Sequence, residues 1–356
     1  RGGDAKSDAW ERSAEEEREL ARRVAEIKAA NGMPPHTILV PDDYERVYEA
    51  VEEACGRMIH YGDYPEPDPD GYVEPAVNEY GQGILVEWLE WKQGLGQPVF
   101  VRWGIHDWGR WSERRQTWKH PMLIVVRGRL YLKGEDGTIL CGQWMFLDGS
   151  SGVLSHMMLK TEHFRPGMGG GLCLHFDGGN WTVQNCQLRV RPAPMITCVG
   201  VSNRANVTLD WCLLSRQQNC VPGAWGYGIF AWGKAPRVTC RNLTLTELKV
   251  GVDAGDGSAV SLAGCTFRHN RVGVYMRCDA EVSVDDCDFS YNHKGCFHVG
   301  RPAQGTTRLR VRDTRVKACA MWGDADRPGV LEEANVTVNE TGHAKVYDGT
   351  GIPIPG

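Results

Sequence analysis

The sequence lacks the features that mark membrane-spanning and nucleic-acid-binding chains. It has no run of 18 apolar residues, so we expect no transmembrane helix. It also has no excess of basic charge, because 40 Lys and Arg stand against 45 Asp and Glu, which gives a net charge of −5. Since a nucleic-acid partner needs a basic surface, we do not expect one for this chain.

Motifs for metal and redox chemistry are missing too. The 13 cysteines contain no Cys-x-x-Cys pair, and the 11 histidines contain no His-x-His or His-Glu-x-x-His spacing. These spacings are typical of zinc ribbons, thioredoxin-like sites and zinc proteases. We therefore expect no metal site and no cofactor. The sequence starts at Arg1 without an apolar leader, and because a targeting peptide could have been removed, its compartment stays open.

Glycine and cysteine are abundant instead, with 43 and 13 residues, and twelve of the cysteines lie after residue 140. This half of the chain repeats an eight-residue pattern: apolar, Thr or Ser, apolar, two polar residues, Cys, any residue, apolar. Clear copies span 181–188, 207–214, 238–245, 260–267 and 282–289, and weaker copies span 153–159, 309–316 and 330–337. A second strand that opens with Gly follows four of the clear copies, at 228–232, 251–255, 273–277 and 295–299. A period of about 20–30 residues built from short β-runs predicts an all-β parallel solenoid whose stacked rungs share one core.

The part of the chain before the repeats has a different pattern. Residues 8–30 have the spacing of an amphipathic helix, 37–40 that of a strand and 45–55 that of a second helix. Residues 56–97 are rich in turn formers, and short β-like runs begin at residue 98.

These features together resemble the right-handed parallel β-helix superfamily, which is pectate-lyase-like. The particular likeness is to the β-helix of F-box β-helix proteins and to carbohydrate-binding and sugar-hydrolase repeats. Residues 37–55 look like the opening strand, Pro-Asp turn and helix of that group, and 99–106, 123–128 and 130–142 look like its first rungs. The resemblance implies a single-stranded right-handed β-helix over 37–345 with an inserted loop at 56–97, a helical extension over 1–36 and a tail over 346–356. The N-terminal helices would then cap one end, and no F-box-like helical region accompanies them.

Two sets of residues recur at equivalent positions of the repeat. Cys186, Cys212, Cys265 and Cys287 share one position between apolar neighbours, so we expect these thiols to face the core as small apolar groups. Unpaired thiols favour a reducing intracellular or organellar compartment over secretion, and whether the Asn-x-Thr sequons of the repeat are glycosylated stays open. Asn270 and Asn292 are expected to occupy left-handed turn positions between strands.

The Gly-led strands predict an aromatic strip on the outside of the solenoid. Their inward positions fall on Ile229, Val252, Val274 and Cys296, and His298 is also expected inward. Their outward positions are Phe230, Asp253, Tyr275 and Phe297, joined two residues later by Trp232 and Arg277. Such a strip indicates a protein partner, a glycan, or ordinary packing against another part of the chain.

A second aromatic group lies within residues 102–119, where five Lys or Arg stand against two acids. Its tryptophans are Trp103, Trp108, Trp111 and Trp118. Trp mixed with Arg is typical of a protein interface, and a long loop packed on the first rungs would have the same composition.

Two functions remain open at this point, and the sequence leans towards the one without catalysis. In the first, the chain is a binding or scaffold module that holds a protein or glycan partner on the aromatic strip and the Trp-rich segment. In the second, it is a polysaccharide lyase, hydrolase or epimerase that uses Asp253 and Arg277, with Asp285 and Asp286 as further acids. Only a lyase would add Ca²⁺. Asp285 and Asp286 are adjacent and should point different ways, so solvated turn acids are the better interpretation of this pair.

Overall fold

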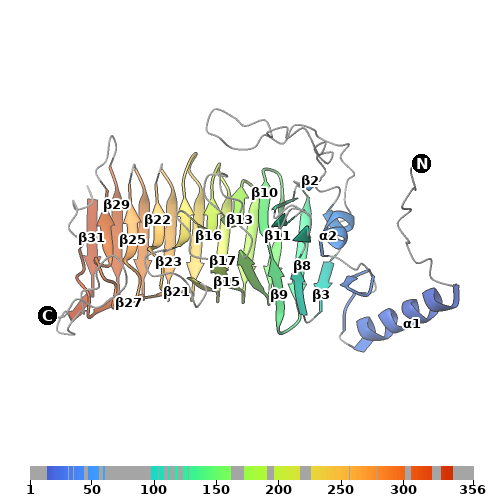
Figure 1. The fold of residues 1–356 in the computed structure, drawn as a ribbon. Helices are drawn as coiled ribbons and strands as arrows, with labels where there is room; N and C mark the ends of the chain where they lie inside the picture. The colour runs from blue at the N-terminus through green and yellow to red at the C-terminus, as the bar shows by residue number, and fades with distance from the viewer. Residues whose placement is uncertain are drawn as a thin grey trace.

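The structure is a computed structural model, and it describes residues 14–30, 32–34, 36–43, 47–55, 59–60, 98–102, 104–107, 111–112, 117–118, 123–126, 128–161, 172–190, 196–216, 226–255, 257–277, 279–300, 306–322 and 330–339. Within these residues the strands stack into one elongated β-solenoid, with early rungs at one end and late rungs at the other (Figure 1). Its strands are parallel except Ile59–His60, which pairs antiparallel with Leu123–Val126. The all-β solenoid expected from the repeat is therefore confirmed.

Three long sheets form the walls of the solenoid in the described residues. The first sheet has eleven strands, in the order β1 (Ile38–Val40), β3 (Pro98–Val101), β8 (Arg129–Gly134), β11 (Ser151–Ser155), β14 (Asn180–Gln184), β17 (Asn206–Asp210), β20 (Arg237–Arg241), β23 (Ala259–Ala263), β26 (Glu281–Asp285), β29 (Arg308–Arg312) and β31 (Val330–Ala334). The second sheet has nine, in the order β2 (Ile59–His60), β7 (Leu123–Val126), β10 (Gln143–Leu147), β13 (Leu172–Asp177), β16 (Thr197–Val201), β19 (Tyr227–Ala231), β22 (Val250–Ala254), β25 (Val272–Met276) and β28 (Phe297–Val299).

The third sheet has ten strands, in the order β4 (Gly104–Asp107), β9 (Thr138–Cys141), β12 (Met158–Thr161), β15 (Gln187–Val190), β18 (Leu213–Arg216), β21 (Thr244–Thr246), β24 (Thr266–Arg268), β27 (Asp288–Ser290), β30 (Arg315–Lys317) and β32 (Thr337–Asn339). A short antiparallel pair, β5 (Trp111–Ser112) and β6 (Thr117–Trp118), stands apart from the three walls. The described helices are α1 (Ala14–Ala30) and α2 (Val47–Cys55).

Each copy of the repeat supplies one strand of the first sheet, a corner, and one strand of the third sheet. The first residues of the five clear copies lie side by side in register: Trp181, Val207, Val238, Val260 and Val282. The last weak copy is shifted by one residue from the expected start, because Leu331 pairs with Leu309. The repeat therefore sets the register of the walls, since a one-residue slip would turn its apolar positions outward.

Aromatic and aliphatic side chains stack in the interior from one rung to the next. Phe146 stacks on Phe176 with ring centroids 4.6 Å apart, and Phe267 stacks on Phe289 at 4.5 Å. All four rings are fully buried, and burying a side chain of this size contributes about 1.5–3 kcal/mol. Stacked apolar rungs therefore supply the main stabilisation of the walls.

The buried asparagines differ from the expectation. Asn270 and Asn292 do not adopt a left-handed conformation; the residues before them, His269 and Tyr291, do so with φ of 55° and 54°. The Asn292 Oδ1 atom accepts a hydrogen bond from the Asn270 amide at 3.1 Å, and its Nδ2 donates to the Phe267 carbonyl at 3.0 Å. The asparagines therefore serve as buried partners for backbone groups that the corner leaves without a strand partner.

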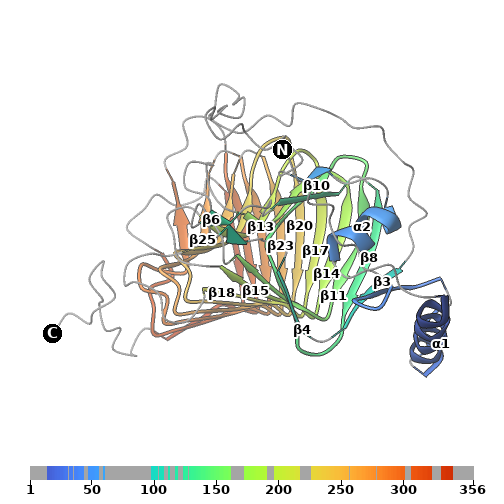
Figure 2. The ribbon, with the colours of Figure 1, turned by 45° about the vertical axis from the view of Figure 1, so that its right-hand side comes forward.

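The helix α2 caps the N-terminal end of the solenoid, as expected. Its Val47, Ala50, Val51 and Ala54 are buried in the same core as the strands, and the helix contacts β1, β3 and β8. Figures 1 and 2 show α2 beside the first rungs. In the described part of the chain, neither helix is both long and apolar enough to cross a membrane.

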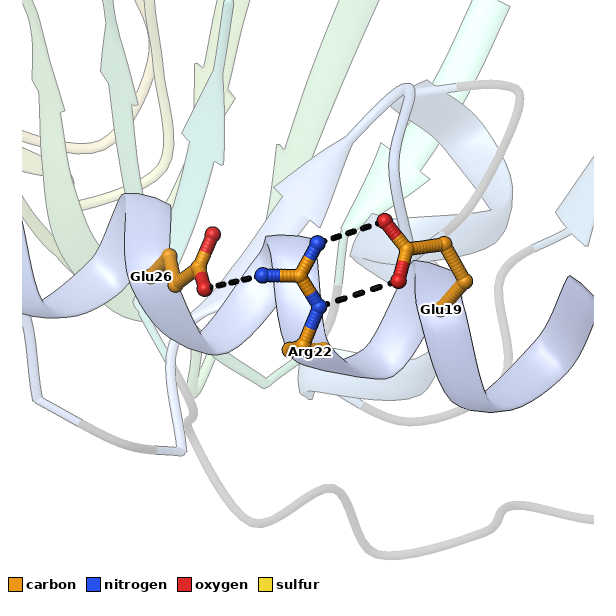
Figure 3. Close-up of polar contacts among 3 residues, drawn as sticks. All are labelled: Glu19, Arg22 and Glu26. Carbon is orange, nitrogen blue, oxygen red and sulfur yellow. Dashed lines mark hydrogen bonds and ion pairs between the residues drawn. The ribbon is translucent and has the colours of Figure 1, made fainter.

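The preceding helix α1 exposes a charged face. The Arg22 guanidinium donates to Glu19 at 2.6 and 2.9 Å and to Glu26 at 2.5 Å (Figure 3). These pairs are more than half exposed, so solvent screens them and they contribute little to stability. At its C-terminal end, Lys28 pairs with Asp43 at 3.2 Å and connects the helix to the turn after β1.

Candidate binding face

The expected strip lies on the outer side of the second sheet. Phe230 on β19 pairs in register with Asp253 on β22, and Asp253 pairs with Tyr275 on β25. The inward neighbours Ile229, Val252 and Val274 are fully buried, which confirms the alternation. Phe230 and Tyr275 are partly exposed, whereas Asp253 is only 4 % exposed.

The expected place of Phe297 on this strip is wrong. Phe297 is fully buried, and its ring packs against Phe289 at 5.0 Å and against Trp322 at 5.8 Å. The register pairs Val274 with Phe297 and Tyr275 with His298, so β28 is one residue out of step with the earlier strands. The extra residue is accommodated at Gly295, whose φ of 114° few other residues adopt. His298, expected inward, therefore takes the outward position.

Two side chains, Trp232 and Arg277, extend over the preceding rung of the second sheet, where the outward residue is small or short. The rung of Gly200 has no side chain, and the Trp232 ring lies there: a Cβ on Gly200 would come within 2.9 Å of it. The rung of Asp253 has a short side chain, and Arg277 covers it from the end of β25. Each rung from β13 to β28 consequently presents one flat group to the outside.

These groups form a continuous stack, which we name the stacked ladder: His175, Trp232, Phe230, Arg277, Tyr275 and His298. The ring centroids of His175 and Trp232 are 5.2 Å apart, and those of Trp232 and Phe230 are 4.6 Å apart. The Arg277 guanidinium lies 5.4 Å from the Phe230 centroid and 5.5 Å from that of Tyr275. Tyr275 stacks in turn on His298 at 4.9 Å. These spacings follow the separation of neighbouring strands, which is about 4.8 Å.

The carboxylate of Asp253 is neutralised within the stack. Arg277 donates from Nε to Oδ1 at 3.1 Å and from Nη2 to Oδ2 at 2.6 Å, so the pair is bidentate. Both oxygens of the candidate catalytic acid therefore accept hydrogen bonds from the residue expected to act beside it.

A polar group at the His175 end of the stacked ladder was not anticipated from the sequence. The Ser202 hydroxyl donates to Asp177 Oδ1 at 2.6 Å, Asn203 Nδ2 donates to the same oxygen at 2.6 Å, and His175 Nε2 lies 3.1 Å from the Ser202 oxygen. Burial lowers the pKa of His175, and Asp177 opposes this shift in part. The alternation of LCLHFD over β13, which puts His175 and Asp177 on the outside, is the signal that could have revealed them.

This polar group does not have the arrangement of a nucleophilic triad. A nucleophilic serine gives its proton to a histidine that an acid orients on the far side. Here the Ser202 hydroxyl donates its single proton to Asp177, so this proton is not directed at His175. Ser202 is also only 2 % exposed, which closes it to a substrate. The group fixes the orientation of His175 rather than activating a serine.

The other acids named from the sequence lie elsewhere. Asp285 ends β26 on the first sheet, and Asp286 occupies the next corner with a φ of 46°. The nearby Asp288, which begins β27 on the third sheet, lies 3.7 Å from Arg315. The structure therefore does not bring Asp285 or Asp286 to the face that carries Asp253.

The cysteines of the repeat lie inside the solenoid, as expected. Cys186, Cys212, Cys265 and Cys287 are at most 2 % exposed, and no disulfide bond joins any of the ten cysteines whose side chains are described. Burial raises the pKa of Cys173, which keeps it protonated at neutral pH.

The Trp-rich segment falls mostly outside the described residues. Trp103 and Trp108 are not described, and Trp111 and Trp118 are described only as backbone partners in the β5–β6 pair. Their proposed place in an interface therefore stays a prediction.

Comparisons with known proteins support the fold. A family model described as the right-handed beta helix region matches residues 224–341, which contain β19 to β32. No curated protein and no solved structure matches the chain significantly.

Among the described residues, no group of three or more His, Cys, Asp or Glu is arranged to hold a metal ion. The family match and the three-walled parallel solenoid together identify the chain as a right-handed parallel β-helix protein.

Proposed function

We propose that this chain is a non-catalytic scaffold that holds a protein partner on the outer face of the second sheet. The observation that carries the proposal is the stacked ladder, an unbroken row of flat groups over six rungs with partly exposed edges. The face is continuous, and it runs along the solenoid axis.

The composition of the stacked ladder is that of a protein-binding hot spot. Trp, Tyr and Arg are the residues most enriched where truncation weakens protein complexes. Mutual stacking holds each side chain in one orientation before any partner arrives, so binding costs little side-chain entropy. Gly200 helps to hold Trp232 in its stacked position, because any larger residue at 200 would displace the indole ring.

The orientation of the rings favours a protein over a glycan on this face. A sugar packs its C–H groups on the open face of an aromatic ring. In the stacked ladder, both faces of Phe230 are covered, by Trp232 and by Arg277. The edges that remain carry the positive end of the ring quadrupole, which attracts backbone carbonyls and the ring faces of a partner.

The alternative of a polysaccharide-active enzyme has less support. Hydrolysis of a glycosidic bond uses two carboxylates, one as an acid and one as a base or nucleophile. On this face, Asp253 is bound to Arg277 and Asp177 accepts from Ser202 and Asn203. Both carboxylates therefore accept hydrogen bonds from neighbouring side chains of the protein.

The proposal is tested by capture of partners with three versions of the chain. We compare the wild type, the double variant Phe230→Ser/Tyr275→Ser, and Tyr131→Ser, which alters an exposed ring on the first sheet. Melting curves establish that all three are folded. We expect one protein to be retained by the wild type and Tyr131→Ser and lost by the double variant, and the purified pair to bind with a Kd raised about tenfold or more by the double change.

Three outcomes would contradict this function. The same proteins could be captured by all three versions, which would leave the stacked ladder as internal packing. A glycan array could show a ligand that the double variant loses, which would assign the face to a glycan. Turnover of a uronate polymer that disappears in Asp253→Asn would assign it to an enzyme.

A further inference from the structure

The corner between the first and third sheets has one left-handed residue in each of the eight rungs from β11–β12 to β31–β32. Its backbone amide donates across the corner to the next rung, as from Trp211 to the Arg241 carbonyl at 3.0 Å. Eight described residues occupy this position with φ between 46° and 62°: His156, Asn185, Trp211, Asn242, Gly264, Asp286, Asp313 and Asn335. Six of the eight are Asn, Asp or Gly, the residues that tolerate this conformation best.

His156 and Trp211 are the two exceptions at this corner, and Trp211 is the bulkier of them. Its φ is 50°, where a bulky side chain is strained, and Asn or Gly would fit the turn without that strain. Packing does not compensate, because Trp211 is 65 % exposed, more than any other large apolar residue in the described part of the chain. A strained and exposed tryptophan is a reason to look for a function outside the fold.

The indole ring is open, in contrast to the rings of the stacked ladder. No ring stacking and no cation–π contact to Trp211 is found among the described residues. Along the corner, its neighbours are the exposed amides of Asn185 and Asn242, and the residue before it is Asp210. Asn242 Nδ2 donates to Asp210 Oδ1 at 3.4 Å, which holds these two polar groups together beside the ring.

We propose that Trp211, flanked by Asn185, Asp210 and Asn242, is a contact site for a pyranose ring of a glycan. A pyranose whose hydroxyls are all equatorial has flat C–H faces that match an open indole, and its hydroxyls both donate and accept hydrogen bonds. Amide and carboxylate groups beside the indole offer both kinds of partner. A protein interface would instead surround its tryptophan with further apolar groups, whereas the three flanking residues Asn185, Asp210 and Asn242 are all polar.

This site is separate from the proposed protein-binding face. Trp211 lies where the first and third sheets meet, whereas the stacked ladder lies on the second sheet. The chain could therefore hold a glycan and a protein at the same time, and each proposal can fail without the other.

The test uses Trp211→Asn, which replaces the tryptophan with the residue that the corner prefers. Cellohexaose and xylohexaose serve as probes because their rings have only equatorial hydroxyls, and Tyr131→Ala is the control at another exposed ring, on β8. We expect titration calorimetry to show binding of at least one probe by the wild type and the control, with a Kd about tenfold higher or more for Trp211→Asn. We also expect the melting temperature of Trp211→Asn to equal or exceed that of the wild type.

Each other outcome overturns the proposal. Absence of binding to both probes, or equal binding by Trp211→Asn, would remove the sugar site. A lower melting temperature for Trp211→Asn would show that the tryptophan stabilises the fold. Loss of a captured protein in Trp211→Asn, without any sugar binding, would assign the corner to a protein partner.

Discussion

Arg277 reaches back by one rung and holds both carboxylate oxygens of Asp253, at 3.1 and 2.6 Å. The Asp253 side chain is 5 % exposed and that of Arg277 is 40 % exposed, so the guanidinium shields the acid from solvent. The same guanidinium fills the space between Phe230 and Tyr275. One residue therefore both neutralises a buried charge and completes the stacked ladder.

Removal of this guanidinium should destabilise the solenoid. Arg277→Met keeps the aliphatic stem but removes the positive guanidinium that binds both oxygens of a buried carboxylate, and we expect a loss of about 3 kcal/mol in the free energy of unfolding. Urea unfolding measures it. In the matched double variant Asp253→Asn/Arg277→Met the orphaned charge is gone, so part of the loss should be recovered. Equal stability of the single variant and the wild type would show that water replaces the guanidinium freely.

The one-residue shift of β28 predicts opposite behaviour for two neighbouring residues. Phe297 is fully buried, so Phe297→Ala should cost about 3–5 kcal/mol through the cavity that it leaves. His298 lies outward and partly exposed on Tyr275, so His298→Ala should cost about 1 kcal/mol or less. If urea unfolding showed a larger loss of stability for His298→Ala than for Phe297→Ala, His298 would be the inward residue, as the sequence predicted.

The buried asparagines predict a loss of stability on truncation. Asn292→Ala removes the acceptor of the Asn270 amide and the donor to the Phe267 carbonyl. Leaving such groups unsatisfied costs about 1–3 kcal/mol each. The control is Tyr291→Asn, which places a residue suited to φ of 54° at the preceding position and should change stability little. If thermal unfolding ranked the two variants the other way, the asparagine contacts would not be the stabilising element.

The histidine at the end of the stacked ladder predicts a pH dependence of stability. Burial lowers the folded-state pKa of His175 below its usual 6.5, so the unfolded chain takes up a proton before the folded chain does. Stability should therefore fall as the pH drops below 6.5, until the folded-state pKa is reached. Burial lowers the pKa of His269 and His293 as well, which adds to the same trend. Melting temperatures from about pH 7.5 to about pH 5 should fall less steeply for His175→Gln than for the wild type.

Most of the fold could be predicted from the sequence because a parallel solenoid is built from local repeats. The apolar alternation of each copy, such as 260–267, decides which side of the wall is buried, and the recurrence of the copies sets which strands are neighbours. The part of the site that lies within regular strands, Phe230, Asp253 and Tyr275, followed from the same alternation.

The sequence-based predictions were wrong at positions where one rung differs from the others or where a residue type has two possible roles. An extra residue near Gly295 moved Phe297 into the core, and repeat spacing could not reveal it because a single bulge leaves the pattern of residue types almost unchanged. The buried role of Asn270 was hidden because a buried acceptor and a turn former have the same sequence signature.

The sequence by itself determined a stack of short β-rungs with an apolar interior, a helix at its N-terminal end and an outer row of aromatic residues, because each of these depends on residues close together in the chain. Only the tertiary structure decided that Trp232 and Arg277 fold back into neighbouring rungs, that the ring faces of the stacked ladder are covered, and that Trp211 is left open at a strained corner. Those features depend on which side chain fills the space above a glycine or a short acid in the neighbouring rung. Contacts between residues 24 and 32 positions apart in the chain, Asp253 with Arg277 and Gly200 with Trp232, decide it.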